Sequence, residues 1–405
     1  MSSSPLSDAQ RNVWLLVAAQ SLGAAAPPIL ISLGGLVGQM LSGSAALATL
    51  PVSLYHLGLA LSTLPAALLM RRLGRRAAYC LGAVLGMASG LLAAVGVLEG
   101  SFATFCIGTA LAGFYGACVQ NYRFAASDAV SAEQRPQAIS RIMVGGLVAA
   151  VIGPQLVIWT RDAWPAAPFA GSFVGQAALA LLALPLLWRL RMPAPQAEQQ
   201  ADGPARPLAV IARTPRFIVA AMAGVVSYGL MSFLMTAAPM AMVGCGFTVG
   251  EAALGIQWHV LAMFVPSFFT GRLIARWGKV TITALGLALI GASGLMALMG
   301  LQLQHFWGSL VLLGLGWNFG FIGATAMVTE TYTAAERAKV QALNDFLIFG
   351  TVAVASFGSG HLLGASGWDA INLLMLPLVG AALLMLGAHA WRERSRAGTS
   401  ALAGR

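Results

Sequence analysis

The stretch Gly271-Arg272-Leu273-Ile274-Ala275-Arg276-Trp277-Gly278-Lys279 decides the fold of this chain. It is a short basic segment between two long apolar runs, and a weaker copy, Arg71-Arg72-Leu73-Gly74-Arg75-Arg76, occurs in the first half of the sequence. A histidine precedes each copy, since His56 lies eighteen residues before Gly74 and His259 nineteen residues before Gly278. The chain therefore contains two related halves that run in the same direction, as parallel repeats about an axis along a membrane normal do.

The composition identifies a membrane protein. Of 405 residues, 58% are hydrophobic and only 9% are charged, and the mean hydropathy is +0.80. Soluble domains carry roughly 25% charged residues. Twelve apolar runs are long enough to cross about 30 Å of hydrocarbon at about 1.5 Å per residue. The predicted spans are 12–38, 47–70, 76–98, 102–124, 137–160, 168–188, 217–243, 250–274, 280–301, 306–329, 338–361 and 368–391.

The basic residues predict the orientation of these spans. If twelve spans alternate, 22 of the 23 Lys and Arg residues fall on one side, and only Arg161 falls on the other. Short cytoplasmic loops concentrate Lys and Arg, so we expect both termini to be cytoplasmic, in a bacterial-type inner membrane. The net charge of +10 is then a topology signal. It does not indicate nucleic-acid binding, which needs a solvated basic domain.

One long polar connection divides the chain. Residues 189–216 contain Pro193, Pro195 and several glutamines, a composition typical of a flexible linker. We expect an N-terminal six-helix half over 1–188, a cytoplasmic linker over 189–216, and a C-terminal six-helix half with a short tail over 217–405. Residues 1–11 are short and polar and lack the pattern of a cleavable signal, so we expect the first span to be retained.

The basic loop resembles the conserved loop of the major facilitator superfamily, Gly-x-Leu-x-Asp-Arg-x-Gly-Arg/Lys. The resemblance implies that Gly271, Arg276, Gly278 and Lys279 form the conformational loop of the second half. In the weaker copy, it implies the same role for Arg72, Gly74 and Arg75. The position of the motif's aspartate holds Ala275 in one copy and Arg71 in the other. With twelve spans and a central linker, the resemblance covers the whole chain and implies an all-α major facilitator fold.

Two pairs in consecutive spans suggest a substrate. Met231 with Met235, and His259 with Met263, are each four residues apart, which places both members of a pair on one helix face. Thioether and imidazole groups suit a soft metal ion, Cu(I) above all. These four residues also resemble the Met-x-x-x-Met and His-x-x-x-Met motifs of the CcoA-like copper importers. That resemblance implies copper import for cytochrome oxidase assembly, with copper as the transported substrate and no cofactor.

The predicted depths of the four side chains agree with this hypothesis. At 1.5 Å per residue, Met235 lies about 12 Å and Met231 about 18 Å below the outer surface. On the same arithmetic, His259 lies at about 13 Å and Met263 at about 19 Å. Substrate sites of such transporters are expected near the bilayer centre. The alternative is that the methionines fill an apolar core and the histidine bonds to a neighbouring helix.

Further residues leave other interpretations open. His56 and Cys245 are candidate accessory ligands. A second hypothesis is a facilitator for a small organic molecule, such as a vitamin or drug, whose pocket is lined by Trp258, Tyr228, Phe264 and Asn318. Transport direction and coupling ion stay open, because importers and exporters share this architecture.

Other functions are excluded by missing motifs. The sequence contains no phosphate-binding Gly-x-x-x-x-Gly-Lys, no nucleophile triad and no cofactor fingerprint, so we expect neither an ATPase nor an enzyme. None of the 13 Asp and Glu residues lies at the predicted centre of a span, and Asp345 is the deepest. We expect a monomer surrounded by lipid.

Overall fold

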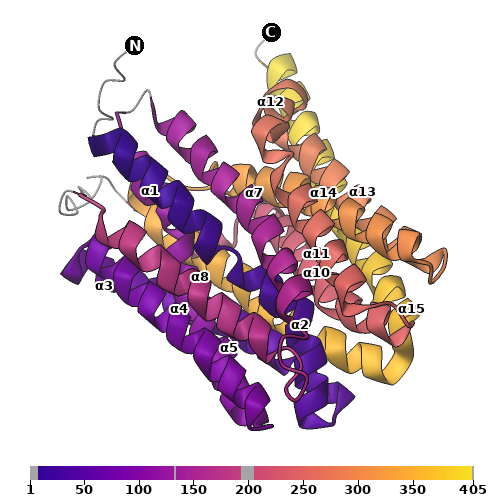
Figure 1. The fold of residues 1–405 in the computed structure, drawn as a ribbon. Helices are drawn as coiled ribbons and strands as arrows, with labels where there is room; N and C mark the ends of the chain where they lie inside the picture. Colours follow the sequence, from indigo (N-terminus) through magenta and orange to yellow (C-terminus); the bar gives the residue numbers. More distant parts are fainter. Residues whose placement is uncertain (1–7, 132–133, 193–204, 404–405) are drawn as a thin grey trace, which may run out of the picture.

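The computed structural model describes residues 8–131, 134–192 and 205–403. All of its regular elements there are helices (Figure 1). Those before the linker are α1 (Asp8–Gly23), α2 (Ala26–Ser42), η1 (Ala45–Leu47), α3 (Leu50–Leu73), α4 (Arg75–Leu98), α5 (Phe102–Gln120), α6 (Tyr122–Asp128), α7 (Arg135–Thr160) and α8 (Ala170–Trp188). Those after it are α9 (Leu208–Ala212), α10 (Pro215–Gly244), α11 (Val249–Phe264), α12 (Ser267–Trp277), α13 (Lys279–Leu298), α14 (Leu303–Val328), η3 (Ala334–Glu336) and α15 (Arg337–Ala403).

These helices account for the twelve predicted spans. Within the described residues, ten helical segments are long and apolar enough to cross a membrane, and the bent pair α11–α12 makes an eleventh. Helix α15 supplies two spans, because Gly367 leaves the helical conformation at φ 78° and divides it. The sequence predicted a six-residue connection there, over 362–367, whereas only this glycine leaves the helix. The reason is that glycine alone adopts a positive φ at little cost, so one residue suffices for the turn.

Proline interrupts the predicted span 250–274. The helices α11 and α12 meet at an angle of 44° beside Pro266. Proline has no N–H to donate, so a helix bends where the backbone bond is lost. Asn318 of α14 adds hydrogen bonds at the bend, since its Nδ2 donates to the Met263 carbonyl at 2.6 Å and to Ser267 Oγ at 2.7 Å. Thr270 Oγ1 donates to Asn318 Oδ1 at 2.6 Å, which completes the polar junction of the three helices.

The apolar side chains form separate cores. One large cluster is built mainly from α10, α11, α13, α14 and α15, and includes Leu234, Ile256 and Leu313. Two further clusters lie among the helices before the linker, one around Tyr79 and one around Phe173. Each bundle therefore has an interior of its own. The predicted domain boundaries stay a prediction, and residues 193–204 of the linker lie outside the described residues.

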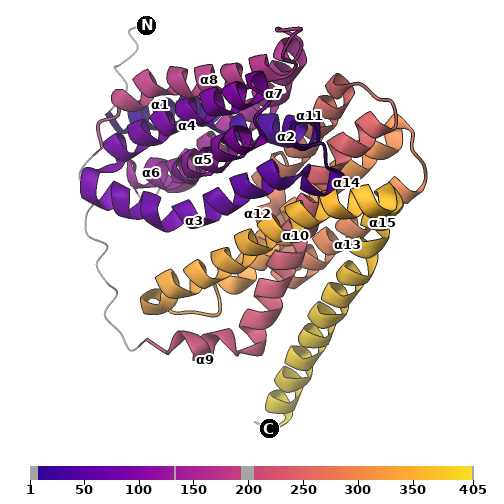
Figure 2. The same cartoon turned by 90° about the horizontal axis from the view of Figure 1, so that it is seen from below.

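The two bundles meet at one end of the molecule. Figure 1 shows that α1 begins and α15 ends at the same end, called here the termini end, while α2, α10 and α15 come together at the opposite end. There, Gln155 Nε2 of α7 donates to Gln257 Oε1 of α11 at 2.9 Å, and Thr49 Oγ1 donates to the Phe357 carbonyl of α15 at 3.2 Å. The view turned by 90° shows the same contact between α3 and α15 (Figure 2). The opposite end is therefore closed by contacts between bundles.

The two copies of the basic loop have the same backbone geometry. Gly74 joins α3 to α4 with φ 81° and ψ 157°, and Gly278 joins α12 to α13 with φ 83° and ψ 150°. Both conformations favour glycine. The residue after each glycine makes a corresponding ion pair, since Arg75 NH2 lies 2.5 Å from Asp128 Oδ2 and Lys279 pairs with Glu330. The repeat seen in the sequence is thus a repeat of structure.

Candidate functional site

An aromatic cluster lies near the middle of the spans that follow the linker. Tyr228 of α10 is at its centre, with ring centroids 5.3 Å from Trp317, 5.1 Å from Phe321 and 5.8 Å from Phe349, all in edge-on geometry. Trp317 and Phe321 are stacked at 5.2 Å, and Phe264 lies 6.3 Å from Trp317. Four helices thus contribute rings to one site. Such a site offers flat apolar faces to a planar ligand.

Glycines bring the helices close enough for this arrangement. On α14, a Cβ at Gly316 would lie 2.8 Å from the Gly286 carbonyl of α13, and one at Gly320 would lie 2.4 Å from Ser227 Oγ of α10. Small residues allow this close packing of membrane helices. Trp317 and Phe321 are four residues apart, so they share one helix face. Close packing of α14 against α13 and α10 thereby fixes where both rings lie.

The cluster faces the bundle that precedes the linker. Tyr228, Phe321 and Phe349 are each partly exposed, and Phe349 packs against the core that contains Tyr79. Tyr228 also lies near Tyr55 of α3 and Arg123 of α6. The aromatic surface therefore lies at the boundary between the two bundles, where a transported molecule would have to pass.

Two charged side chains border the cluster. Arg123 belongs to the bundle before the linker, and it lies near Tyr228 and Asp345 of the other bundle. Asp345 lies on α15 and its Oδ1 accepts a hydrogen bond from Asn344 Nδ2 at 3.5 Å. Sequence analysis noted Asp345 but missed Arg123, which it counted among the cytoplasmic basic residues. The sequence could have indicated Arg123 as a candidate site residue, because it falls inside the predicted span 102–124.

The four predicted metal ligands lie in the core. The exposed fractions are 1% for Met231, 3% for Met235, 7% for Met263 and 0% for His259. All three methionines belong to the large apolar cluster with Ile256 and Leu313. His259 Nδ1 is 2.7 Å from the Leu310 carbonyl of α14, so the imidazole ties α11 to α14. This is the geometry of the alternative in which methionine fills space and histidine bonds to a neighbouring helix.

The accessory residues are separate from this group. His56 is buried on α3 with its ring 5.2 Å from Tyr55, and Cys245 is exposed after the end of α10. Within the described ranges, no three His, Cys, Asp or Glu side chains gather in a way that could hold a metal ion.

The residues predicted to line an organic pocket divide into two groups. Tyr228 and Phe264 both belong to the aromatic cluster. Trp258 is 47% exposed and makes none of the ring contacts of the cluster, and Asn318 is fully buried at the α11–α12 bend. Sequence analysis missed Trp317, Phe321 and Phe349, because many aromatic residues in the spans follow the same helical spacing.

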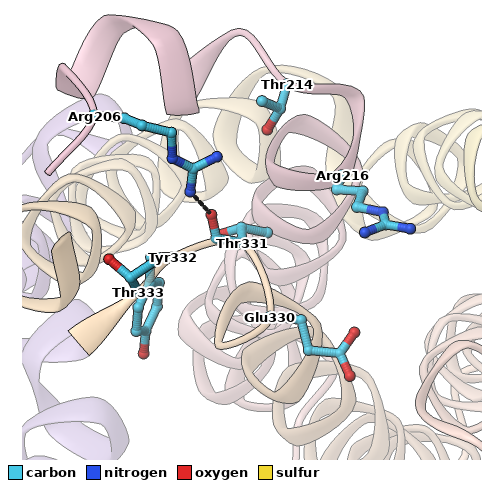
Figure 3. Close-up of a pocket in the computed structure, with 7 residues that line it drawn as sticks. All are labelled: Arg206, Thr214, Arg216, Glu330, Thr331, Tyr332 and Thr333. Carbon is cyan, nitrogen blue, oxygen red and sulfur yellow. Dashed lines mark hydrogen bonds between the residues drawn. The ribbon is translucent and has the colours of Figure 1, made fainter. Parts of the chain in front are cut away.

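A small polar cavity of about 210 Å³ lies at the termini end. Its walls are Arg206, Thr214, Arg216, Glu330, Thr331, Tyr332 and Thr333 (Figure 3). Each of its charged groups has a partner, since Arg206 pairs with Glu336, Arg216 with Glu393 and Glu330 with Lys279. Because these charges are already paired, the cavity has no free charge with which to select an ionic substrate.

Arg206 fixes the end of the linker to the loop between α14 and α15. Its Nε and NH2 groups donate to Glu336 Oε1 and Oε2, both at 2.8 Å, and NH2 also donates to the Thr331 carbonyl (Figure 3). The Thr333 backbone N–H donates to Glu336 Oε2 at 2.9 Å. The side-chain hydrogen bond from Arg206 holds the pKa of the Glu336 carboxyl well below its usual range. This contact is structural.

Three comparisons with known proteins agree on the class. The family model described as the Major Facilitator Superfamily matches residues 13–317 and 220–405. The riboflavin transporter RfnT of Brucella anthropi is 61% identical over 93% of this chain and 95% of its own length. The uncharacterized MFS-type transporter YdeG of Bacillus subtilis is 30% identical over 90% of this chain and 88% of its own length. A solved structure of the nucleoside transporter NupG has a TM-score of 0.70 and 14% identity, covers 93% of this chain and 99% of its own, and shows likeness of fold alone.

These comparisons correct the predicted function. Copper transport is wrong, because a relative that is 61% identical over nearly the whole chain transports riboflavin. The resemblance to the copper-importer branch is likewise not supported. The physical reason for the error is that methionine is a common filler of apolar cores, and its spacing alone does not distinguish a ligand from a packing residue. Metal binding by Met231, Met235, His259 and Met263 stays a prediction from the sequence. The copper transport that this binding was meant to support is wrong.

The superfamily and the fold are confirmed. The family model covers most of the chain, the described residues form only helices, and the relatives are transporters rather than enzymes. Ten or more apolar helices make it a multi-pass membrane protein. The chain belongs to the major facilitator superfamily.

Proposed function

We propose that this protein transports riboflavin across the membrane. The observation that carries the proposal is the 61% identity to a riboflavin transporter over 93% of this chain. The organic-substrate hypothesis from the sequence therefore replaces copper transport.

The chemistry of the aromatic cluster supports this substrate. Riboflavin contains a flat tricyclic isoalloxazine ring, which stacks on aromatic side chains, and a ribityl chain with hydroxyl groups. The rings of Tyr228, Phe321 and Phe349 are partly exposed. The Tyr228 ring centroid lies 5.1 Å from that of Phe321 and 5.8 Å from that of Phe349. Stacking of a heterocyclic base on an aromatic side chain contributes about 1–3 kcal/mol. The Trp317 Nε1–H is buried and has no hydrogen-bond partner within the described residues, so it is available to a polar atom of the ligand.

The transport mechanism is alternating access. Two six-helix halves, 1–188 and 217–405, rock about the central site, while the linker 189–216 and both termini stay on the cytoplasmic side of the inner membrane. The distribution of Lys and Arg residues supports this orientation. The contacts Gln155–Gln257 and Thr49–Phe357 support a state in which the outer end is closed and the site opens toward the cytoplasm. The protein acts as a monomer in lipid.

The test is uptake of labelled riboflavin by proteoliposomes that contain the purified protein. We expect Tyr228→Leu to lower uptake about tenfold, because the central ring of the cluster is lost. Met231→Leu is the matched control on the same helix. It replaces a buried thioether by a side chain of similar volume, which a packed core tolerates, and we expect it to retain uptake.

Two outcomes would contradict the proposal. One is that proteoliposomes with the unchanged protein take up no riboflavin above empty liposomes. The other is that Met231→Leu abolishes uptake while Tyr228→Leu does not, since thioether chemistry rather than stacking would then carry the function.

A further inference from the structure

A pair of opposite charges stands inside apolar spans beside the aromatic cluster. Arg123 lies within the span Phe102–Asp128 and Asp345 within Lys339–Glu393. Both side chains are exposed in this structure, although their spans are apolar. Ionisable residues inside membrane spans are costly and usually face a cavity or a substrate path. Their position inside apolar spans therefore indicates a role in binding or transport.

Helix geometry places Asp345 next to the rings. Asp345 precedes Phe349 by four residues on α15, so the two side chains share one helix face. The Phe349 ring lies 5.8 Å from Tyr228, and Arg123 of the other bundle lies near Tyr228 and Asp345. A planar molecule stacked on the cluster would therefore have one of its edges beside a guanidinium and a carboxylate.

Two neighbouring polar atoms have no hydrogen-bond partner among the described residues. Asn344 is buried beside Asp345, and its Oδ1 has no hydrogen-bond partner among the described residues. Trp317 Nε1 likewise has no partner there, and its ring lies 5.3 Å from that of Tyr228. Buried polar atoms without partners are uncommon, because each costs the free energy of a lost hydrogen bond. The site thus offers donors and acceptors at the border of an apolar surface.

This arrangement matches one edge of the flavin ring, and the match rests on the proposed function. The pyrimidine edge of isoalloxazine is an imide, in which an N3–H donor lies between two carbonyl acceptors. A guanidinium donates to carbonyl oxygens, and a carboxylate or amide oxygen accepts from an N–H. The dimethylbenzene edge is apolar and has no hydrogen-bond donor or acceptor for a charged side chain. We propose that Arg123 and Asp345 bind the pyrimidine edge of the flavin and select substrates by their imide.

The test compares riboflavin with 3-methylriboflavin as competitors of labelled riboflavin uptake. Methylation removes the N3–H and leaves the stacking surface. For the unchanged protein, we expect 3-methylriboflavin to compete about tenfold less well, since a hydrogen bond to a charged group is lost. For Asp345→Ala, both compounds should compete equally, because the acceptor is gone. Asp345→Asn keeps one acceptor oxygen and should retain part of the discrimination.

Two further measurements test which part of the flavin Arg123 contacts and whether a variant has lost binding or has failed to fold. Lumiflavin, which lacks the ribityl chain, should lose affinity in Arg123→Lys as riboflavin does, because lysine lacks the planar fork of arginine. Asp369→Asn changes an exposed acid on α15 beyond Gly367 and should retain full discrimination. Uptake is normalised to protein in the membrane, so a variant that folds poorly is recognised.

The inference is overturned if the unchanged protein accepts both flavins equally, or if Asp345→Ala keeps the full discrimination. It is also overturned if Arg123→Lys leaves the affinity for lumiflavin unchanged, since the arginine would then contact the ribityl chain. These results leave riboflavin transport itself intact. Failure of the unchanged protein to transport riboflavin would instead refute the proposed function.

Discussion

The two ends of the molecule are held by different kinds of contact. At the end opposite the termini, the bundles meet through neutral groups. Gln155 Nε2 donates to Gln257 Oε1 at 2.9 Å, and Thr49 Oγ1 donates to the Phe357 carbonyl of α15. At the termini end, the ion pairs Arg75–Asp128 and Lys279–Glu330 each join residues of the same bundle. Neutral hydrogen bonds contribute only about 0.5–1.5 kcal/mol net. Contacts that must break in every transport cycle are thus weak, and charged contacts stabilise parts that move as units.

Covalent closure of the opposite end should have the largest effect. The described cysteines Cys80, Cys106, Cys118 and Cys245 are free, so they are first replaced by alanine. In that background, Gln155→Cys with Gln257→Cys is treated with a bifunctional methanethiosulfonate, which bridges two thiols reversibly. We expect riboflavin transport to fall to background and to return after reduction, because this end can no longer open. Each single cysteine variant treated with the same reagent is the control. Full transport by the bridged protein would show that the end opposite the termini does not have to open.

Crowding the closed end should have an intermediate effect. A Cβ at Gly360 of α15 would lie 2.3 Å from Thr49 Oγ1, whereas one at Gly358 would meet no atom within 4 Å. Overpacking costs about 1–3 kcal/mol, which shifts a two-state equilibrium roughly 5- to 150-fold. Gly360→Val should therefore open this end, measured as faster maleimide labelling of Gln257→Cys.

Gly358→Val is the matched control, because it makes the same change on the same helix without the clash. If both valine variants label at equal rates, the contact between Thr49 and Gly360 does not hold this end closed.

Breaking an ion pair inside one bundle should have the smallest effect on transport. Glu336→Gln removes the carboxylate that binds Arg206. We expect a Tm lower by a few degrees and unchanged labelling of Gln257→Cys, because this contact joins the linker to the loop of its own bundle. A change in labelling rate would show that the contact also controls the opposite end.

The pH dependence of this variant follows from the lowered pKa. The hydrogen bonds from Arg206 hold the pKa of Glu336 in the folded protein well below its ordinary value of 4.5, so the charge stabilises the fold above about pH 4.5. This stabilisation is lost as the pH falls toward the folded pKa. The difference in Tm between the unchanged protein and Glu336→Gln should therefore be largest at neutral pH and shrink in acid. A constant difference across this range would mean that the carboxylate charge is not what stabilises the contact.

Hydropathy predicted most of the fold because it depends on local composition. The predicted span 76–98 corresponds to Arg75–Leu98, and 217–243 corresponds to Pro215–Gly244. The bend in α11–α12 was missed, although Pro266 signals it, because a proline in a membrane helix does not by itself give the angle. The bend also involves Asn318, which lies about fifty residues further along the chain and donates to the Met263 carbonyl next to the break.

The site was harder to predict, since four-residue spacing does not show which way a helix face points. Met231 and Met235 share a face, as predicted, but that face packs into the core. Tyr228, three residues before Met231, is on the same side of α10 and yet contacts Trp317 and Phe349, so the spacing did not show which residue of that side packs into the core.

The sequence by itself predicted twelve apolar spans and two related halves, with Gly74 and Gly278 at matching places in the repeated loop. These properties follow from composition and from the conformations open to single residues. Only the tertiary structure decided that His259 bonds to Leu310, and that Arg123 lies near Tyr228. The reason is that glycine-lined contacts between helices set the rotation of each helix, and that rotation determines which side chains meet.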